Sequence, residues 1–166
     1  MTNDTRLMSM EAPEGEFVDR MGLVMERLGG TRTMGRLYGW LMVCDPPERS
    51  LTELAADLDV SKTAVSTVAR QLEAGGMIER APAPSREHRY RVVSGGWMSV
   101  MRVQMSAVRL SLDTLDFGLS VVGEDRPDQR ARLAETRDFF AFTVRDADEF
   151  LQRWQDYREG ARDETR

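Results

Sequence analysis

The chain has 166 residues, of which 41% are hydrophobic and 31% are charged, and its formal net charge is −5. This length and apolar content suffice to bury a core in one domain or in two closely joined lobes. No stretch approaches the ~18 consecutive apolar residues of a membrane helix, and residues 1–16 lack a signal-peptide apolar run, so we expect a soluble cytoplasmic protein. One cysteine and one histidine exclude an internal disulfide and most metal clusters, and no cofactor is expected.

The charge is distributed unevenly along the chain. Residues 1–59 contain 6 basic and 11 acidic side chains, residues 60–93 contain 6 and 3, and residues 94–166 contain 11 and 14. The acidic total argues against nucleic-acid affinity over the whole surface, but the middle segment is net positive and carries Lys62, the only lysine of the sequence.

Two helices are predicted before this basic segment, within residues 13–49, after a disordered tail over residues 1–12. The first has an apolar face with 4-3-4 spacing, Phe17, Met21, Val24 and Leu28, and ends at two glycines. The second runs from about Thr33 to Cys44, and its glycines at positions 35 and 39 permit close approach of another backbone. Cys44 ends an apolar run, so we interpret it as a buried thiol in preference to a redox sensor.

Residues 50–93 are predicted to form a winged helix-turn-helix. Ser50-Leu51-Thr52-Glu53 is a capping box that begins a short helix, and Ser61 caps the next helix after a tight turn. Two short helices joined by three or four residues form a helix-turn-helix. Residues 77–81 and 88–93 are then expected as a two-stranded β wing, with residues 82–87 as its tip.

The second of these helices presents a polar face. If it buries Ala64, Val65, Val68 and Leu72, it presents Lys62, Thr63, Ser66, Thr67 and Arg70 outward, with Ser61 at its start. Lys62 can approach a phosphate at the positive end of the helix dipole, and hydroxyl groups can bind base edges. A solvated helix face is the alternative, which the following basic hairpin makes less favourable. That hairpin contains Arg80, Arg86, His88, Arg89 and Arg91.

The C-terminal part, residues 94–158, is predicted to be a helical hairpin that serves as a dimerisation lobe, followed by a flexible tail over residues 159–166. One apolar seam comprises Met101, Met105, Val108, Leu112, Leu115 and Leu119. The other comprises Leu133, Phe140, Val144, Ala147, Leu151 and Trp154, with a gap at Arg137, and the turn lies at residues 123–127. A purely intramolecular bundle is the alternative.

The stretch "SLTELAADLDVSKTAVSTVARQLEAGGMIER" followed by "PSREHRYRVV" resembles the winged helix of the MarR transcription-factor family, and "GRLYGWLMV" upstream is similar to its GbsR-like branch. The resemblance covers roughly residues 17–93. It implies a mainly α fold and a homodimer that binds a palindromic operator in double-stranded DNA. By position, the exposed residues of the helix at 62–70 match the recognition helix, and Arg86 matches the wing-tip arginine. The tip departs from the family pattern because it lacks the usual glycine and has Ser85 where many relatives carry an acidic residue.

The branch that the sequence resembles includes regulators that sense small osmolyte-related ligands, and aromatic faces hold quaternary ammonium groups. Tyr38, Trp40 and Trp97 are therefore the candidate effector-binding residues, with Phe117, Phe139 and Phe140 as further candidates; the alternative places these rings in the core. We expect a sequence-specific transcriptional regulator whose DNA-binding residues are Ser61, Lys62, Thr63, Ser66, Thr67, Arg70, Arg86 and Arg89. A winged-helix module that binds another protein is the alternative. An enzyme has little support, because the sequence has no Gly-rich phosphate loop, Ser-His-Asp set or metal-ligand spacing.

Overall fold

A computed structural model of the chain describes residues 12–82 and 88–163. Its contacts divide the chain into two units, Met1–Val100 and Met101–Arg166, and each is described by itself below. Within the described residues, no helix is long and apolar enough to cross a membrane. The predicted disordered tail over residues 1–12 lies outside the described part except for Ala12, which begins the first helix.

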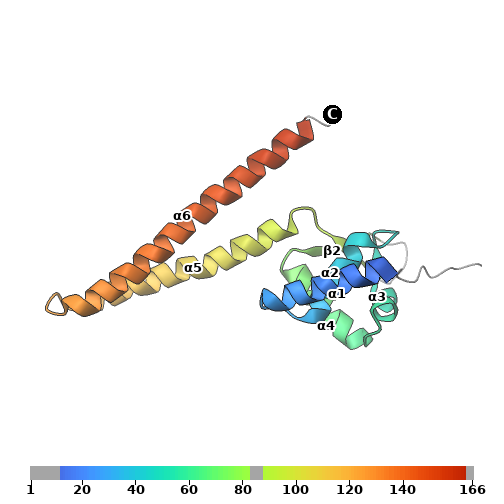
Figure 1. Cartoon of the computed structure of the whole chain (residues 1–166), viewed down its shortest axis with the longest axis horizontal. Coiled ribbons are helices and arrows are strands. Elements are labelled where there is room, and N and C mark those ends of the chain that lie inside the picture. Colours follow the sequence, from blue (N-terminus) through green and yellow to red (C-terminus); the bar gives the residue numbers. More distant parts are fainter. Residues whose placement is uncertain (1–11, 83–87, 164–166) are drawn as a thin grey trace, which may run out of the picture. The chain divides into compact units, whose positions relative to one another are not determined.

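The first unit begins with two tightly packed helices, α1 (Ala12–Arg27) and α2 (Arg32–Val43) (Figure 1). A Cβ atom at Gly35 would collide with the backbone of Met21 and Gly22, so the predicted close approach at this glycine is confirmed. Arg36 donates hydrogen bonds to Asp19 of α1 at 2.9 Å and to the carbonyl of Leu58 at 3.0 Å. One arginine of α2 therefore binds both α1 and the last residue of the next helix, α3 (Leu51–Leu58).

The helix-turn-helix consists of α3 (Leu51–Leu58) and α4 (Lys62–Ala74). Ser50 and Glu53 form the predicted capping box, and Asp59 has a φ of 53°, which turns the chain sharply between the helices. Both helices bury their apolar faces in one core with α2. Its fully buried side chains include Leu37, Leu54, Leu58, Val65 and Leu72. Cys44 is buried beside this core, as predicted, and burial raises the pKa of its thiol.

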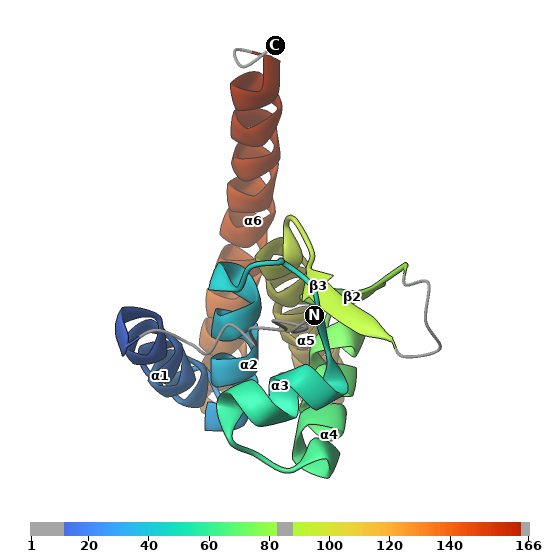
Figure 2. The same cartoon turned by 90° about the vertical axis from the view of Figure 1, so that its right-hand side faces the viewer.

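The predicted two-stranded wing is present, and a short strand that precedes the helix-turn-helix extends it to a three-stranded antiparallel sheet. The strands are β1 (Arg49–Ser50), β2 (Ile78–Ala81) and β3 (Arg89–Val92), in the order β1-β3-β2. Figure 2 shows β2 and β3 side by side. Arg49 pairs with Tyr90 and Ser50 with Arg89. The sequence did not predict β1, because a strand of two residues has no alternating pattern to detect.

The second unit is a helical hairpin made of α5 (Gly96–Val121), which begins in the first unit, and α6 (Pro127–Asp163). The turn lies where predicted, and Arg130 donates hydrogen bonds to the carbonyls of Leu119 and Val122, both at 2.7 Å. Arg137, the gap in the predicted α6 seam, forms an ion pair with Asp116 of α5. Residues 159–163, expected in a flexible tail, continue α6.

Candidate nucleic-acid interface

Helix α4 is built to present a polar face beside the core. Its N-cap, Ser61, accepts a hydrogen bond from the amide of Ala64 at 3.2 Å, which fixes where the helix begins. Its buried residues are Val65, Val68, Ala69 and Leu72. On the opposite side lie the predicted DNA-binding residues, which are exposed except for the half-buried Ser66: Lys62, Thr63, Ser66, Thr67 and Arg70. The structure thus brings together the residues of α4 that the sequence assigns to DNA.

Lys62 reaches from α4 to the first turn of α3. Its ammonium donates a hydrogen bond to the hydroxyl of Thr52 at 2.8 Å, and both side chains are exposed. Two groups from different helices that can donate hydrogen bonds therefore lie within reach of one phosphate oxygen. The sequence did not indicate Thr52, because residues ten positions apart on two helices give no periodic signal.

Two other side chains on this face bond to their own helix. The hydroxyl of Thr67 donates to the carbonyl of Thr63 at 3.0 Å, and the guanidinium of Arg70 donates to the carbonyl of Ser66 at 3.3 Å. Thr67 leaves its methyl group and oxygen lone pairs for contacts outside the helix. Arg70 keeps further donors on its guanidinium, so it can bind a phosphate without leaving the helix.

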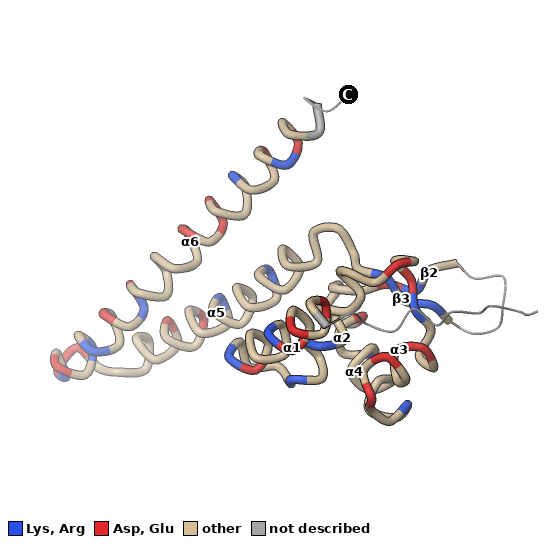
Figure 3. The backbone as a smooth tube through the Cα atoms, turned by 45° about the vertical axis from the view of Figure 1, so that its right-hand side comes forward, with Lys and Arg blue, Asp and Glu red and all other residues tan. Residues whose placement is uncertain are grey.

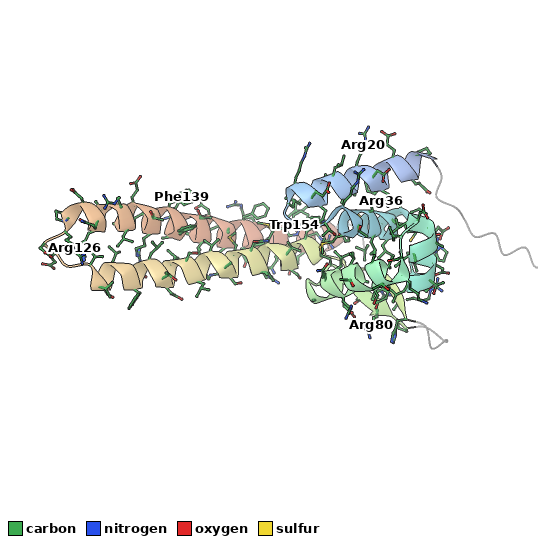
Figure 4. All side chains as sticks on the ribbon, turned by 90° about the horizontal axis from the view of Figure 1, so that it is seen from below. Arg20, Arg36, Arg80, Arg126, Phe139 and Trp154 are labelled. Carbon is green, nitrogen blue, oxygen red and sulfur yellow. The ribbon has the colours of Figure 1, made fainter. Side chains whose placement is uncertain are left out.

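The arginines of the wing strands are paired with glutamates. The pairs are Arg80 with Glu73 at 3.0 Å, Arg89 with Glu53 at 2.9 Å and Arg91 with Glu79 at 2.7 Å. Figure 3 shows basic and acidic residues close together around β2 and β3, and Arg80 is labelled in Figure 4. The positive charge that the sequence assigns to this hairpin is therefore largely compensated in its strands.

Glu53 shows the electrostatic effect of this pairing. Partial burial raises the pKa of its carboxyl, but the hydrogen bond from the Ser50 amide and the positive charge of Arg89 outweigh burial, so the pKa lies below its ordinary value. Glu53 is therefore held in its charged form. The predicted wing-tip arginine, Arg86, lies outside the described residues, while His88 beside it is exposed.

The predicted effector residues occupy two different environments. Tyr38 is buried and meets Trp97 edge to face, with ring centroids 6.0 Å apart, and Trp97 is 38% exposed. Trp40 is buried, and its indole donates to Asp57 at 2.7 Å while Arg49 lies 5.8 Å from its ring centroid. Trp40 thus has the packing and polar partners of a core residue, as the alternative reading expected. Tyr38 and Trp97 lie together, but Trp40 is engaged elsewhere.

Comparison of the sequence with known proteins identifies the family of this chain. The HTH-type transcriptional regulator MmpR5 of Mycobacterium tuberculosis (strain ATCC 25618 / H37Rv) is 39% identical over 136 residues, which are 81% of this chain and 82% of that protein. The chain belongs to the MarR family of transcriptional regulators. A family model described as MmpR5-like MarR family transcriptional regulator matches residues 95–157, which lie almost entirely on α5 and α6.

A solved structure of a related protein shares the fold of this MarR-family chain. A crystal structure of a transcriptional regulator is 36% identical, with a TM-score of 0.72 over 87% of this chain and 99% of that one. The Staphylococcus aureus MepR–DNA complex is 21% identical, with a TM-score of 0.40 over 75% of this chain and 87% of that one.

This MarR-family protein is a DNA-binding transcriptional regulator, and it belongs to a family of regulators and not of enzymes. The predicted fold class, mainly helical with a winged helix-turn-helix and long C-terminal helices, is confirmed. The resemblance to the MarR family is also confirmed. Within the family the matching model is MmpR5-like.

Proposed function

We propose that this regulator is a homodimer that reads a palindromic operator in the cytoplasm, with α4 of each subunit in the major groove and the wing at the neighbouring minor groove. The observation that carries the proposal is the exposed polar face of α4, which begins at a capped N-terminus and bears no acidic residue between Ser61 and Arg70. A helix of this kind fits the major groove of B-DNA.

The residues of the interface divide into two roles. Lys62 and Arg70 would bind phosphates, because their charge does not distinguish bases, and the hydroxyl of Thr52 beside Lys62 would join the same contact. Ser66 and Thr67 would meet base edges, where a hydroxyl can donate or accept and the threonine methyl can contact that of thymine. Thr63 and Ser61 flank these positions, and Arg86 would enter the minor groove from the wing tip.

Dimerisation is supported by apolar side chains that the hairpin leaves exposed. On α5 these include Val103, Leu110 and Phe117, spaced seven residues apart, and on α6 they include Phe139 and Trp154 (Figure 4). A repeat of seven residues places side chains along one line of a helix, where they pack well against another helix. Leu110 also borders an apolar hollow of about 370 Å³ between α5 and α6. We assign this surface to a second copy of the chain, so that two α4 helices are related by a two-fold axis.

The chain then divides by task. Residues 13–49 would support the helix-turn-helix and take part in the dimer through the exposed Leu23, Val24 and Leu28 of α1. Residues 50–93 would bind DNA, and residues 94–158 would form the dimerisation hairpin.

The decisive experiment is to sequence the genomic DNA fragments that the purified protein retains and then to measure variants on the operator they define. Ser66→Ala and Thr67→Ala should weaken operator binding by about 1–3 kcal/mol for each lost contact while leaving nonspecific binding nearly unchanged. If the protein retains no DNA, and no variant of α4 alters DNA binding, a winged-helix module that binds another protein takes the place of this proposal.

A small-molecule effector is the second part of the proposal. Tyr38 and Trp97 support it, because they form an aromatic pair in which one ring is partly exposed, and such rings can hold a quaternary ammonium group. The GbsR-like pattern at Gly35, Arg36 and Gly39 points to the same ligand class. Choline should alter the tryptophan fluorescence of the wild type and its operator affinity, but not those of Trp97→Phe. An unchanged operator affinity at saturating choline would contradict this part.

A further inference from the structure

Arg89 lies at a joint between the wing and the helix-turn-helix. Its guanidinium donates to both carboxylate oxygens of Glu53, at 2.9 and 3.2 Å, and to the carbonyl of Glu48 at 3.0 Å. Its side chain is 28% exposed, and that of Glu53 is 32% exposed. All three hydrogen bonds come from Nη2, and this nitrogen therefore points into the protein, toward the start of α3.

Glu53 also takes part in the cap of helix α3. Its carboxylate accepts a hydrogen bond from the amide of Ser50 at 2.7 Å, which closes the capping box of α3. Ser50 is also the residue of β1 that pairs with Arg89 of β3. A single carboxylate therefore bonds to both the first turn of α3 and a strand of the wing. The backbone pairing of β1 with β3 joins the same two parts of the molecule.

The position of Arg89 along β3 allows this contact to restrain the direction of the wing. Arg89 pairs with Ala81, and this is the last residue pair of the β2–β3 ladder before the connection at residues 82–88. An ion pair at the tip end of the strand restrains the direction of the wing more than one at its base. Because α3 packs on α4, that direction is fixed relative to the recognition helix as well.

We propose that Arg89 is a positioning residue, which sets the wing against α3 through Glu53 and does not itself bind DNA. The inference rests on the proposed function, since it concerns how the wing meets the operator. It replaces the expectation from sequence that Arg89 contacts DNA directly. The lowered pKa of Glu53 agrees with it, because the carboxylate is then charged at neutral pH and keeps the ion pair.

Arg91 supplies a matched control on the same strand. It is more exposed than Arg89, at 45%, and its close ion pair is with Glu79, its neighbour across the β2–β3 ladder, at 2.7 Å. Its distance to Glu48 is longer, 3.7 Å. Arg91→Ala therefore removes the same charge from β3 while leaving the contact between the wing and α3 in place.

The test compares Arg89→Ala, Glu53→Gln, the double variant and Arg91→Ala in the full chain, on the operator selected with the wild type. Glutamine can retain the capping box, so Glu53→Gln removes the ion pair without removing the cap. Operator affinity is measured over a range of salt concentrations, at a temperature where circular dichroism shows every variant folded. Hydroxyl-radical footprints report where the wing protects the minor groove.

We expect Arg89→Ala and Glu53→Gln each to weaken operator binding about threefold to tenfold, and the double variant to be no weaker than either, because the two residues act as one unit. Both should lose protection at the wing-side minor groove while keeping the wild-type slope of log K against log salt. Arg91→Ala should keep the footprint. Arg89→Lys, which can restore one ion pair with Glu53, should recover part of the protection.

Three outcomes would overturn the inference. A salt slope flattened by about one unit per subunit in Arg89→Ala, with Glu53→Gln unchanged, would make Arg89 a phosphate contact. Variants that melt earlier but bind and protect the operator like the wild type would give the pair a role in stability alone. A wild-type protein that selects no DNA would remove the proposed function and this inference with it, whereas the first two outcomes leave the proposed function intact.

Discussion

The two units of this chain handle their apolar side chains in opposite ways. Among the described residues, every buried hydrophobic side chain except Leu151 belongs to the first unit. The second unit leaves large apolar side chains exposed along both of its helices, and the largest exposed fractions there are those of Leu110, Phe117 and Tyr157, at 66–67%. The first unit therefore closes its core within the chain, whereas the second leaves apolar side chains exposed, which the proposed second copy of the chain would cover.

Two helical glycines, one from each unit, show the same contrast at the level of single atoms. At Gly35 of the first unit, an added Cβ would collide with the backbone of α1, whereas at Gly160 on α6 it would meet nothing within 4 Å. Tight packing fixes one arrangement of helices, while an open helix adapts to whatever covers it. The predictions below test this division, beginning with the largest expected effect.

The strongest test places a charge in the stripe of exposed apolar side chains on α5, which comprises Val103, Leu110 and Phe117. Phe117→Asp should raise the dissociation constant of the dimer about 100-fold or more, because it removes a large aromatic contact from each subunit and buries a carboxylate there. Analytical ultracentrifugation over a range of protein concentrations measures the change. Gln104→Asp, at another exposed position of α5 outside the stripe, is the control and should dimerise like the wild type.

If Phe117→Asp and the wild type sediment alike, the stripe is not the subunit interface and the second unit is covered in another way. Leu112, on the predicted seam, is a less selective site, since it is half-buried and its replacement by Asp would disturb the hairpin itself.

The glycine contrast predicts stability effects of opposite sign. Gly35→Ala should lower the free energy of unfolding by about 1–3 kcal/mol, because α1 and α2 must separate to admit the methyl group. Gly160→Ala should leave it unchanged or raise it by up to about 1 kcal/mol, since alanine favours the helical backbone. Urea denaturation followed by circular dichroism measures both. A stable Gly35→Ala variant would mean that the packing of α1 on α2 is looser than described.

Lys62 tests whether DNA binding belongs to the first unit and dimerisation to the second. Lys62→Ala should weaken binding to all DNA sequences and flatten the slope of log K against log salt by about two units for a dimer, since one phosphate contact is lost per subunit. Its sedimentation should match the wild type, because Lys62 belongs to the first unit and is not one of the exposed apolar residues of α5. A changed dimer with an unchanged salt slope would reverse the two assignments.

The smallest expected effect concerns Glu53. Because its pKa is lower in the folded chain than the ordinary 4.5, its charge contributes stability that is fully present above pH 4.5 and is lost as pH falls through the folded value. Wild type should therefore be more stable than Glu53→Gln at pH 7, and the difference should shrink below pH 4.5. Thermal melts of both proteins across this range measure it, and a difference that is constant with pH would show that the ion pair does not stabilise the fold.

Much of the first unit could be predicted from local signals. The capping box at Ser50, the cap at Ser61 and the spacing of buried residues on α4 place the helix-turn-helix to within a residue or two, since each depends on side chains that are neighbours along the helix. The glycine at position 35 likewise indicated a close helix contact before its partner was known.

Contacts between distant segments could not be predicted in this way. The strand β1 forms because Arg49 and Ser50 pair with residues of β3 that lie about forty positions later in the sequence. A two-residue segment has no pattern that predicts such a pairing. The pairing of Arg89 with Glu53 and the approach of Lys62 to Thr52 have the same origin. Counting charges along the sequence could show that residues 60–93 are basic, but not that the arginines of the wing strands face glutamates.

The position of Lys62 makes the protein open to a simple chemical measurement. As the only lysine of the sequence, with an exposed side chain on α4, it is the one side-chain amine that an acylating reagent can modify, besides the amino terminus. Mass spectrometry of the acylated protein would then follow a single residue at the recognition helix. Operator DNA should shield that amine from the reagent, so the degree of acylation would measure how much of the regulator is bound without any label on the DNA.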